Sequence, residues 1–200
     1  IDGKLTPSGI DQRIAGRGDE HQVRPRAVSI TQASELGTVY TPDEVCALAD
    51  CAHARGLHLH VDGSRIANAA VSLGLELGAI TRDCGVDVLS FGGTKNGLML
   101  GEAVVFFDPE LAEHYRYARK QGMQLASKMR FVAAQFTALL KGDLWQRNAR
   151  HANAMAQVLA ERVRKIPGVE VLYAVQANAV FARLPLEVIP VLQRDFFFYP

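Results

Sequence analysis

The chain has 200 residues, 48% hydrophobic and 22% charged, which is the balance of an ordinary globular protein with a sizeable core. Its 22 basic and 21 acidic residues leave a net charge of +1, which excludes the strongly basic surface of a nucleic-acid-binding protein. No apolar run is long enough to span a bilayer, so we expect no membrane partner. The three cysteines, Cys46, Cys51 and Cys84, lack CxxC spacing and favour reduced thiols in a cytoplasmic protein.

Helical and strand-like patterns alternate over the first part of the chain. Thr6 before Pro7 and Thr41 before Pro42 each place a capping hydroxyl ahead of a proline in the first helical turn. In chain order we expect a helix from residue 7, a strand at 27–31, a helix from 42 to about 56, a strand at 57–61, a helix from about 65 to 73, and strands at 86–91 and 103–107. This order predicts an α/β fold with a mostly parallel sheet flanked by helices.

The pattern changes after Asp108 and Pro109. Residues 110 to about 165 read as helix, with breaks near Gly122 and Gly142. We then expect short strands at 169–172 and 179–182, and the last six residues, 195–200, read as one more strand. Because such an apolar terminus would leave an unpaired edge, and because the chain begins without methionine, we expect it to be a piece of a longer polypeptide.

A lysine and an aspartate follow two neighbouring strands of the predicted sheet. Asp62 directly follows the strand at 57–61. Lys95 lies in a glycine-rich turn, Gly-Gly-Thr-Lys-Asn-Gly, after the strand at 86–91. Ligands of parallel sheets bind at the carboxyl ends of the strands. An amine that forms a Schiff base and a carboxylate that pairs with a pyridine nitrogen are what a pyridoxal phosphate enzyme needs. The hydroxyls of Ser90 and Thr94 are candidate donors to the cofactor phosphate.

Each of these residues also has a purely structural interpretation. Lys95 alone would more often be a solvated lysine in a turn, and its turn lacks the spacing of a phosphate-binding P-loop. Asp62 could form an ion pair with Arg65 or cap the following helix. Arg65 is a candidate for binding a substrate carboxylate through two parallel hydrogen bonds, or it is an ordinary surface arginine on the first helical turn.

A metal site is the main alternative of a different class. His58, His60 and Asp62 alternate along one strand, so their side chains share one face. This pattern is similar to the metal-binding strand of metallo-β-lactamase-like hydrolases, which place a further histidine where this chain has Gly63. The other histidines lack ligand-like spacing. We therefore expect no metal.

Three stretches together closely resemble low-specificity L-threonine aldolases, which are fold-type-I pyridoxal phosphate enzymes of the β-eliminating lyase group. They are Ser-Ile-Thr-Gln with Glu-Leu-Gly-Thr-Val-Tyr at 29–40, His-Val-Asp-Gly-Ser-Arg-Ile-Ala-Asn-Ala at 60–69, and Ser-Phe-Gly-Gly-Thr-Lys-Asn-Gly at 90–97. The resemblance runs nearly the whole length of the chain. It implies a fold-type-I, transferase-like large domain whose C-terminal part is residues 1–140, and a partial small α+β domain at 141–200.

The resemblance implies a role for each matching residue. Lys95 matches the Schiff-base lysine, Asp62 the partner of the pyridine nitrogen, and Arg65 the arginine that binds the substrate carboxylate. His60 matches a histidine with a supporting role at the cofactor. In a loosely matching stretch, Lys120 and Arg130 correspond to basic residues near the site that often reach into a neighbouring subunit.

The implied reaction cleaves the Cα–Cβ bond of L-threonine, L-allo-threonine and related β-hydroxy-α-amino acids to glycine and an aldehyde. The family forms homodimers or homotetramers. Its phosphate-binding segment and ring-stacking histidine precede the start of this chain, and a second carboxylate-binding arginine lies just beyond its end. The alternatives are another fold-type-I reaction, either β-elimination or transamination, and a non-catalytic fragment.

Overall fold

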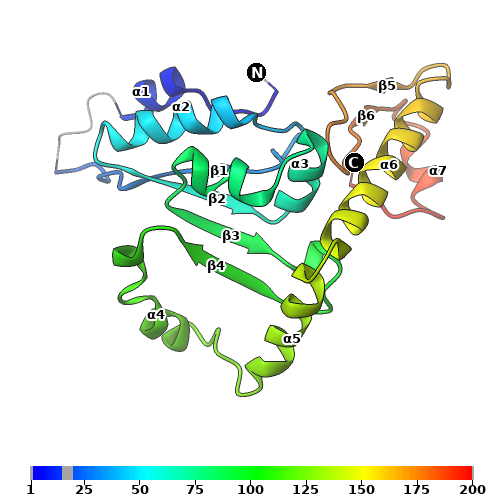
Figure 1. The fold of residues 1–200 in the computed structure, drawn as a ribbon. Coiled ribbons are helices and arrows are strands. Elements are labelled where there is room, and N and C mark those ends of the chain that lie inside the picture. The colour runs from blue at the N-terminus through cyan, green and yellow to red at the C-terminus, as the bar shows by residue number, and fades with distance from the viewer. Residues whose placement is uncertain (1, 15–19, 200) are drawn as a thin grey trace.

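The computed structural model describes residues 2–14 and 20–199, and Figure 1 shows its central four-stranded sheet. The strands lie in the order β1 (Ala27–Thr31), β2 (His58–Gly63), β3 (Val88–Gly92) and β4 (Glu102–Phe106). β1, β2 and β3 are parallel, whereas β4 is antiparallel to β3. The prediction of a mostly parallel sheet is confirmed. The connection at 93–101 is too short for a parallel crossover, which needs roughly a dozen residues, so β4 must reverse direction.

Helices precede and connect the parallel strands as the sequence predicts. α1 (Pro7–Ile14) precedes β1, and α2 (Pro42–His53) connects β1 to β2. α3 (Ile66–Leu73) and the short 3-10 helices η1 (Leu77–Ile80) and η2 (Arg82–Cys84) connect β2 to β3. Thr41 caps α2: its hydroxyl accepts from the backbone N of Glu44, and the Glu44 carboxylate accepts from the backbone N of Thr41. Gly74 ends α3 in the left-handed conformation, with φ 67°.

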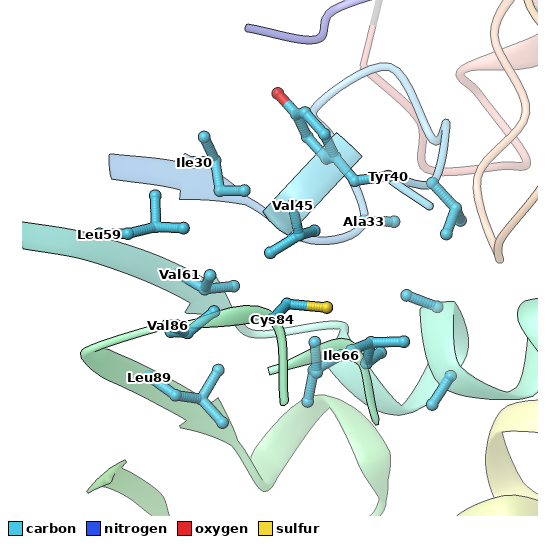
Figure 2. Packing of buried hydrophobic residues seen from close by; sticks show 14 of the residues in the cluster. Ile30, Ala33, Tyr40, Val45, Leu59, Val61, Ile66, Cys84, Val86 and Leu89 are labelled. Carbon is cyan, nitrogen blue, oxygen red and sulfur yellow. The ribbon is translucent and has the colours of Figure 1, made fainter. Parts of the chain in front are cut away.

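The core lies between one face of the sheet and the helices. Leu59 and Val61 of β2 and Leu89 of β3 point to this face and are at most 4% exposed. Figure 2 shows them packed with Val45 of α2 and Ile66 of α3. Burying large aliphatic side chains of this kind stabilises the fold by about 1.5–3 kcal/mol each.

The opposite face of the sheet is polar. Along β2, His58, His60 and Asp62 are half-buried, in alternation with fully buried apolar neighbours. On the strands beside it, Ser29 is exposed and Ser90 is half-buried. Because α2 and α3 pack against the apolar face, the polar face remains accessible in the described part of the chain.

The remaining elements form the second half of the chain. They are η3 (Thr94–Asn96), η4 (Pro109–Ala112), α4 (Tyr115–Gln121), α5 (Met129–Leu140), α6 (Leu144–Val163), β5 (Glu170–Val171), β6 (Ala182–Arg183) and α7 (Ile189–Leu192). The predicted helix breaks near Gly122 and Gly142 are confirmed. In Figure 1, α6 runs from the end of the large sheet to the small sheet of β5 and β6.

Two expectations about the C-terminal strands are wrong. The strand expected at 179–182 lies instead at Ala182–Arg183, because pairing with Glu170 and Val171 selects those residues. Residues 196–199 form no strand, since no strand in the described structure pairs with them. None of the helices in residues 2–14 and 20–199 is both long and apolar enough to cross a bilayer.

Candidate active site

The carboxyl ends of β1, β2 and β3 meet at one edge of the sheet, where ligands bind in parallel α/β folds. The strand register pairs Asp62 with Thr31 on one side and with Ser90 on the other. Directly after β3 the chain enters η3, the 3-10 turn that contains Lys95. Asp62, near the end of β2, and Lys95, in the turn after β3, therefore lie at the same edge of the sheet.

Gly92 lets the end of β3 lie in backbone contact with the loop that follows β2. A Cβ added at Gly92 would lie 2.5 Å from both Cα and the backbone O of Ser64, and 2.8 Å from its backbone C. Ser64 lies between Asp62 and Arg65 in the sequence. The end of β3 and the loop after β2 can approach this closely only because residue 92 has no side chain.

We expect Gly92→Ala to destabilise the protein by roughly 1–3 kcal/mol, because backbone atoms at 2.5 Å must move to admit the methyl group. Urea unfolding measures this change. Gly78→Ala is the matched control, since its nearest contact is the flexible end of the Arg82 side chain at 3.3 Å. Equal unfolding free energies for the two variants would show that the close approach at Gly92 has no energetic consequence.

The turn that carries Lys95 is closed by backbone and hydroxyl contacts. The Thr94 hydroxyl lies 3.3 Å from the backbone O of Gly101 and accepts from the backbone N of Gly101 at 3.1 Å. Gly97 ends the turn with φ 114°, a conformation that favours glycine. Thr94 therefore closes this loop in the structure, and its contact with a cofactor phosphate stays a prediction.

The charged groups of Asp62, Lys95 and Arg65 have no charged partner among the described residues. Asp62 Oδ1 accepts from the backbone N of Ser64 at 2.9 Å, and its Oδ2 accepts no hydrogen bond from any described residue. Among residues 2–14 and 20–199, no ion pair or side-chain hydrogen bond includes Lys95 or Arg65. The alternative of an Asp62–Arg65 ion pair is wrong. The alternative of Asp62 as helix cap is also wrong, since Arg65 itself occupies the N-cap position of α3.

His60 lies in a hydrogen-bonded chain across three strands. Its Nδ1 is 2.8 Å from the hydroxyl of Ser29 on β1, and its Nε2 is 2.9 Å from the hydroxyl of Ser90 on β3. Burial lowers the pKa of His60 below its usual value of 6.5, and the nearby Asp62 carboxylate opposes this shift. The neutral ring, with one nitrogen donating and the other accepting, fits two hydroxyl partners. No motif predicts the contact of His60 with Ser29, and its signal in the sequence is the alternation of polar residues on β1 and β2.

The lowered pKa of His60 predicts a loss of stability in mild acid. The unfolded chain regains a histidine pKa of about 6.5 and therefore binds more protons than the folded chain below that pH. The contribution of the neutral ring is thus complete above pH 6.5 and decreases as the pH falls through the window between the two pKa values. We expect His60→Gln to reduce the decrease in unfolding free energy between about pH 7.5 and 5.5. Urea unfolding over this range measures it, and an unchanged pH dependence in the variant would contradict the assignment.

Lys120 and Arg130 lie on helices that follow β4. Because β4 is antiparallel to β3, the chain leaves the sheet at the edge opposite Lys95, where α4 follows (Figure 1). Lys120 is exposed in the last turn of α4, and Arg130 is exposed at the start of α5, 5.1 Å from the ring centre of Phe131. The structure does not bring Lys120 to the edge that holds Asp62 within one chain. A role for either basic residue stays a prediction.

The polar strand does not assemble a metal centre. The Nδ1 atom of His58 lies 3.9 Å from Asp87 Oδ2, and His53 Nε2 lies 2.9 Å from the same oxygen, at the amino end of β3. His58 thus contacts a different carboxylate from Asp62. No group of three or more His, Cys, Asp or Glu side chains suited to a metal ion occurs among the described residues.

The fold and this edge define an open α/β domain in which, among the described residues, a lysine and a carboxylate without charged partners lie at the ends of adjacent parallel strands. The sequence model of the beta-eliminating lyase family matches residues 1–185. The chain belongs to the beta-eliminating lyase family.

Individual relatives agree with this assignment. The chain is 48% identical over 198 residues to the low specificity L-threonine aldolase of Pseudomonas aeruginosa, covering 98% of this chain and 57% of that protein. It is 49% identical over 182 residues to the enzyme of the same name from a Pseudomonas species, covering 91% and 53%. The structure matches Leishmania major threonine aldolase with a TM-score of 0.90 and 31% identity, over 99% of this chain and 58% of that one. The chain thus spans a little over half the length of these relatives.

Proposed function

We propose that this chain is part of a pyridoxal phosphate-dependent lyase that cleaves the Cα–Cβ bond of L-threonine, L-allo-threonine and related β-hydroxy-α-amino acids to glycine and an aldehyde. The observation that carries the proposal is the group of Lys95, Asp62 and Arg65 at one strand edge, each without a charged partner in the described structure. Asp62 and Arg65 are half-buried and Lys95 is exposed, so all three charged groups are available to a ligand. The names of the Pseudomonas and Leishmania relatives support threonine as the substrate.

The residues present fit the cofactor on which the beta-eliminating lyase family depends. At Gly93, a Cβ would lie 2.6 Å from the backbone O of Gly101, so the close packing of the turn that carries Lys95 requires glycine at this position. The Oδ2 atom of Asp62 has no described partner and suits a protonated ring nitrogen. When bound, pyridoxal phosphate supplies an aldehyde that condenses with amines and a ring that takes up the electrons of the broken Cα–Cβ bond.

Each residue of the chain then has a defined task. Lys95 would provide the Nζ amine that holds the cofactor covalently. Asp62 would pair with the ring nitrogen through its carboxylate. Arg65 would bind the substrate carboxylate through two parallel hydrogen bonds and so orient the Cα–Cβ bond for cleavage. His60, held by two serine hydroxyls, would have a supporting role at the cofactor.

The domain division and the assembly are part of the proposal. Residues 1–140 would form the C-terminal part of the large cofactor-binding domain. Residues 141–200 would begin a small domain, as supported by the separate sheet of β5 and β6 with its own apolar cluster. Met99, Leu100 and Phe131 are 92%, 69% and 60% exposed, and Met99 and Leu100 follow the Lys95 turn. Large exposed apolar side chains beside a site support association into a homodimer or homotetramer.

We also propose a cytoplasmic location. Cys46, Cys51 and Cys84 are all free thiols, which suits a reducing compartment. Burial, together with the neighbouring Cys46, raises the pKa of Cys84 to about 12, so this thiol stays protonated.

The test of the proposed function is product analysis after addition of pyridoxal phosphate and L-threonine. Glycine and acetaldehyde in equal amounts are the expected products. Release of a keto acid with ammonia would instead identify β-elimination, and amino-group transfer to the cofactor would identify transamination. The absence of any visible absorbance band from lysine-bound pyridoxal phosphate would favour the non-catalytic fragment.

A further inference from the structure

The turn that carries Lys95 is attached to α6 by two side-chain amides. Nδ2 of Asn148 donates to the backbone O of Asn96 at 2.9 Å, and Nδ2 of Asn96 donates to the backbone O of Trp145 at 3.3 Å. Asn96 directly follows Lys95 and is 5% exposed. A Cβ at Gly97 would lie 2.7 Å from Asn148 Nδ2, so the turn and α6 are in direct contact.

This attachment decides how the lysine is held. A 3-10 turn of three residues between glycines has little conformational preference of its own. The Lys95 side chain is exposed and bonds to no described residue, so only the backbone of its turn orients it. The amide of Asn148 binds the backbone O of Asn96, the residue that follows Lys95, and so fixes the peptide between Asn96 and Gly97. It therefore holds the C-terminal end of the turn and limits the backbone positions that Lys95 can take.

The same helix is also attached to the other half of the site. Asn68 Nδ2 donates to Asn153 Oδ1 at 3.0 Å, and Asn153 Nδ2 donates to the backbone O of Asn68 at 3.0 Å. Asn68 is 3% exposed and lies in the first turn of α3, the helix that begins directly after Arg65. Figure 1 shows α6 passing both α3 and the end of β3. One continuous helix thus holds the lysine turn and the segment after Asp62 in a fixed relation.

We propose that Asn148 is a positioning residue, which orients Lys95 toward the cofactor by holding the backbone of its turn against α6. This inference rests on the proposed function, because it gives Lys95 the role of the covalent cofactor ligand. Asn148 itself touches neither substrate nor cofactor in this assignment. Its effect passes through Asn96 to the neighbouring lysine.

Hydrogen exchange tests the attachment without any cofactor. In Asn148→Ala we expect the amides of residues 94–98 to exchange about fivefold faster, the change that follows from loss of one ordinary hydrogen bond. Peptides from β1 and β2 should keep wild-type rates. His151→Ala, an exposed position on the same helix, is the matched control and should leave all rates unchanged. Unchanged exchange at 94–98, or equal acceleration over the whole chain, would overturn a local role for Asn148.

Cofactor attachment tests the positioning role itself. Wild type, Asn148→Ala and His151→Ala are each loaded with pyridoxal phosphate, titrated with pH by visible absorbance, reduced with borohydride and mapped by peptide mass spectrometry. We expect a lower yield at Lys95 and a shifted absorbance midpoint in Asn148→Ala alone. Equal yield and midpoint in all three proteins would overturn the positioning role. A wild-type chain with no adduct at Lys95 contradicts the proposed function instead, so the two failures are distinguishable.

Discussion

Lys95→Ala is expected to abolish both covalent attachment of pyridoxal phosphate and cleavage of threonine. An alanine has no amine for the cofactor aldehyde, and the connection between β3 and β4 contains no other lysine. The fold should persist, because Lys95 is exposed and bonds to no described residue. We expect its unfolding free energy to stay within about 0.5 kcal/mol of wild type.

Visible absorbance during titration with pyridoxal phosphate, together with a glycine assay, measures this effect. Lys165→Ala is the matched control, since Lys165 is an exposed lysine beyond the end of α6. The control should keep the wild-type band and activity. A band of equal strength in Lys95→Ala would place the covalent ligand at another lysine and remove the basis of the proposed site.

Asp62→Asn is expected to lower the rate of threonine cleavage by about a hundredfold or more, the usual cost of removing a charge-stabilising group from an active site. A neutral amide cannot keep the ring nitrogen protonated, so the ring accepts electrons less readily. The asparagine side-chain oxygen can still accept from the backbone N of Ser64, as Asp62 Oδ1 does at 2.9 Å. We therefore expect the variant to fold normally and to attach the cofactor at Lys95.

Single-turnover kinetics with loaded protein separates this effect from weaker cofactor binding. Asp50→Asn, at an exposed carboxylate on α2, removes the same charge far from the sheet edge and should leave the rate unchanged. If Asp62→Asn cleaves threonine at the wild-type rate while Lys95 carries the cofactor, Asp62 does not face the ring nitrogen.

Much of the fold could be predicted because its signals are local. The Thr41–Pro42 pair and the capping box define the start of α2, and Gly74 defines the end of α3. The strand positions followed from short apolar runs. β6 was misplaced because a two-residue strand depends on its partner rather than on its own sequence. The antiparallel direction of β4 follows from its connection to β3 at 93–101, which is too short for a parallel crossover.

The candidate site divides in the same way. Lys95, Asp62 and Arg65 stand in short motifs, so the sequence alone made them candidates for a pyridoxal phosphate site, and their roles stay predictions. The contacts around them join residues far apart in the chain. His60 binds Ser29 and Ser90, about thirty residues away on either side, and Asn148 lies 52 residues from Asn96. No periodicity or motif encodes such pairs.

The amino-acid sequence by itself determined the α/β class with a mostly parallel sheet and the order of its helices and strands along the chain, and it made Lys95 and Asp62 the candidate amine and carboxylate of the site. Local propensity and spacing carry this information, because capping, turns and strand periodicity act over a few residues. Only the tertiary structure decided that Gly92 lets the two segments touch and that α6 holds both of them. These contacts arise when distant segments pack together, since close packing selects which side chains meet.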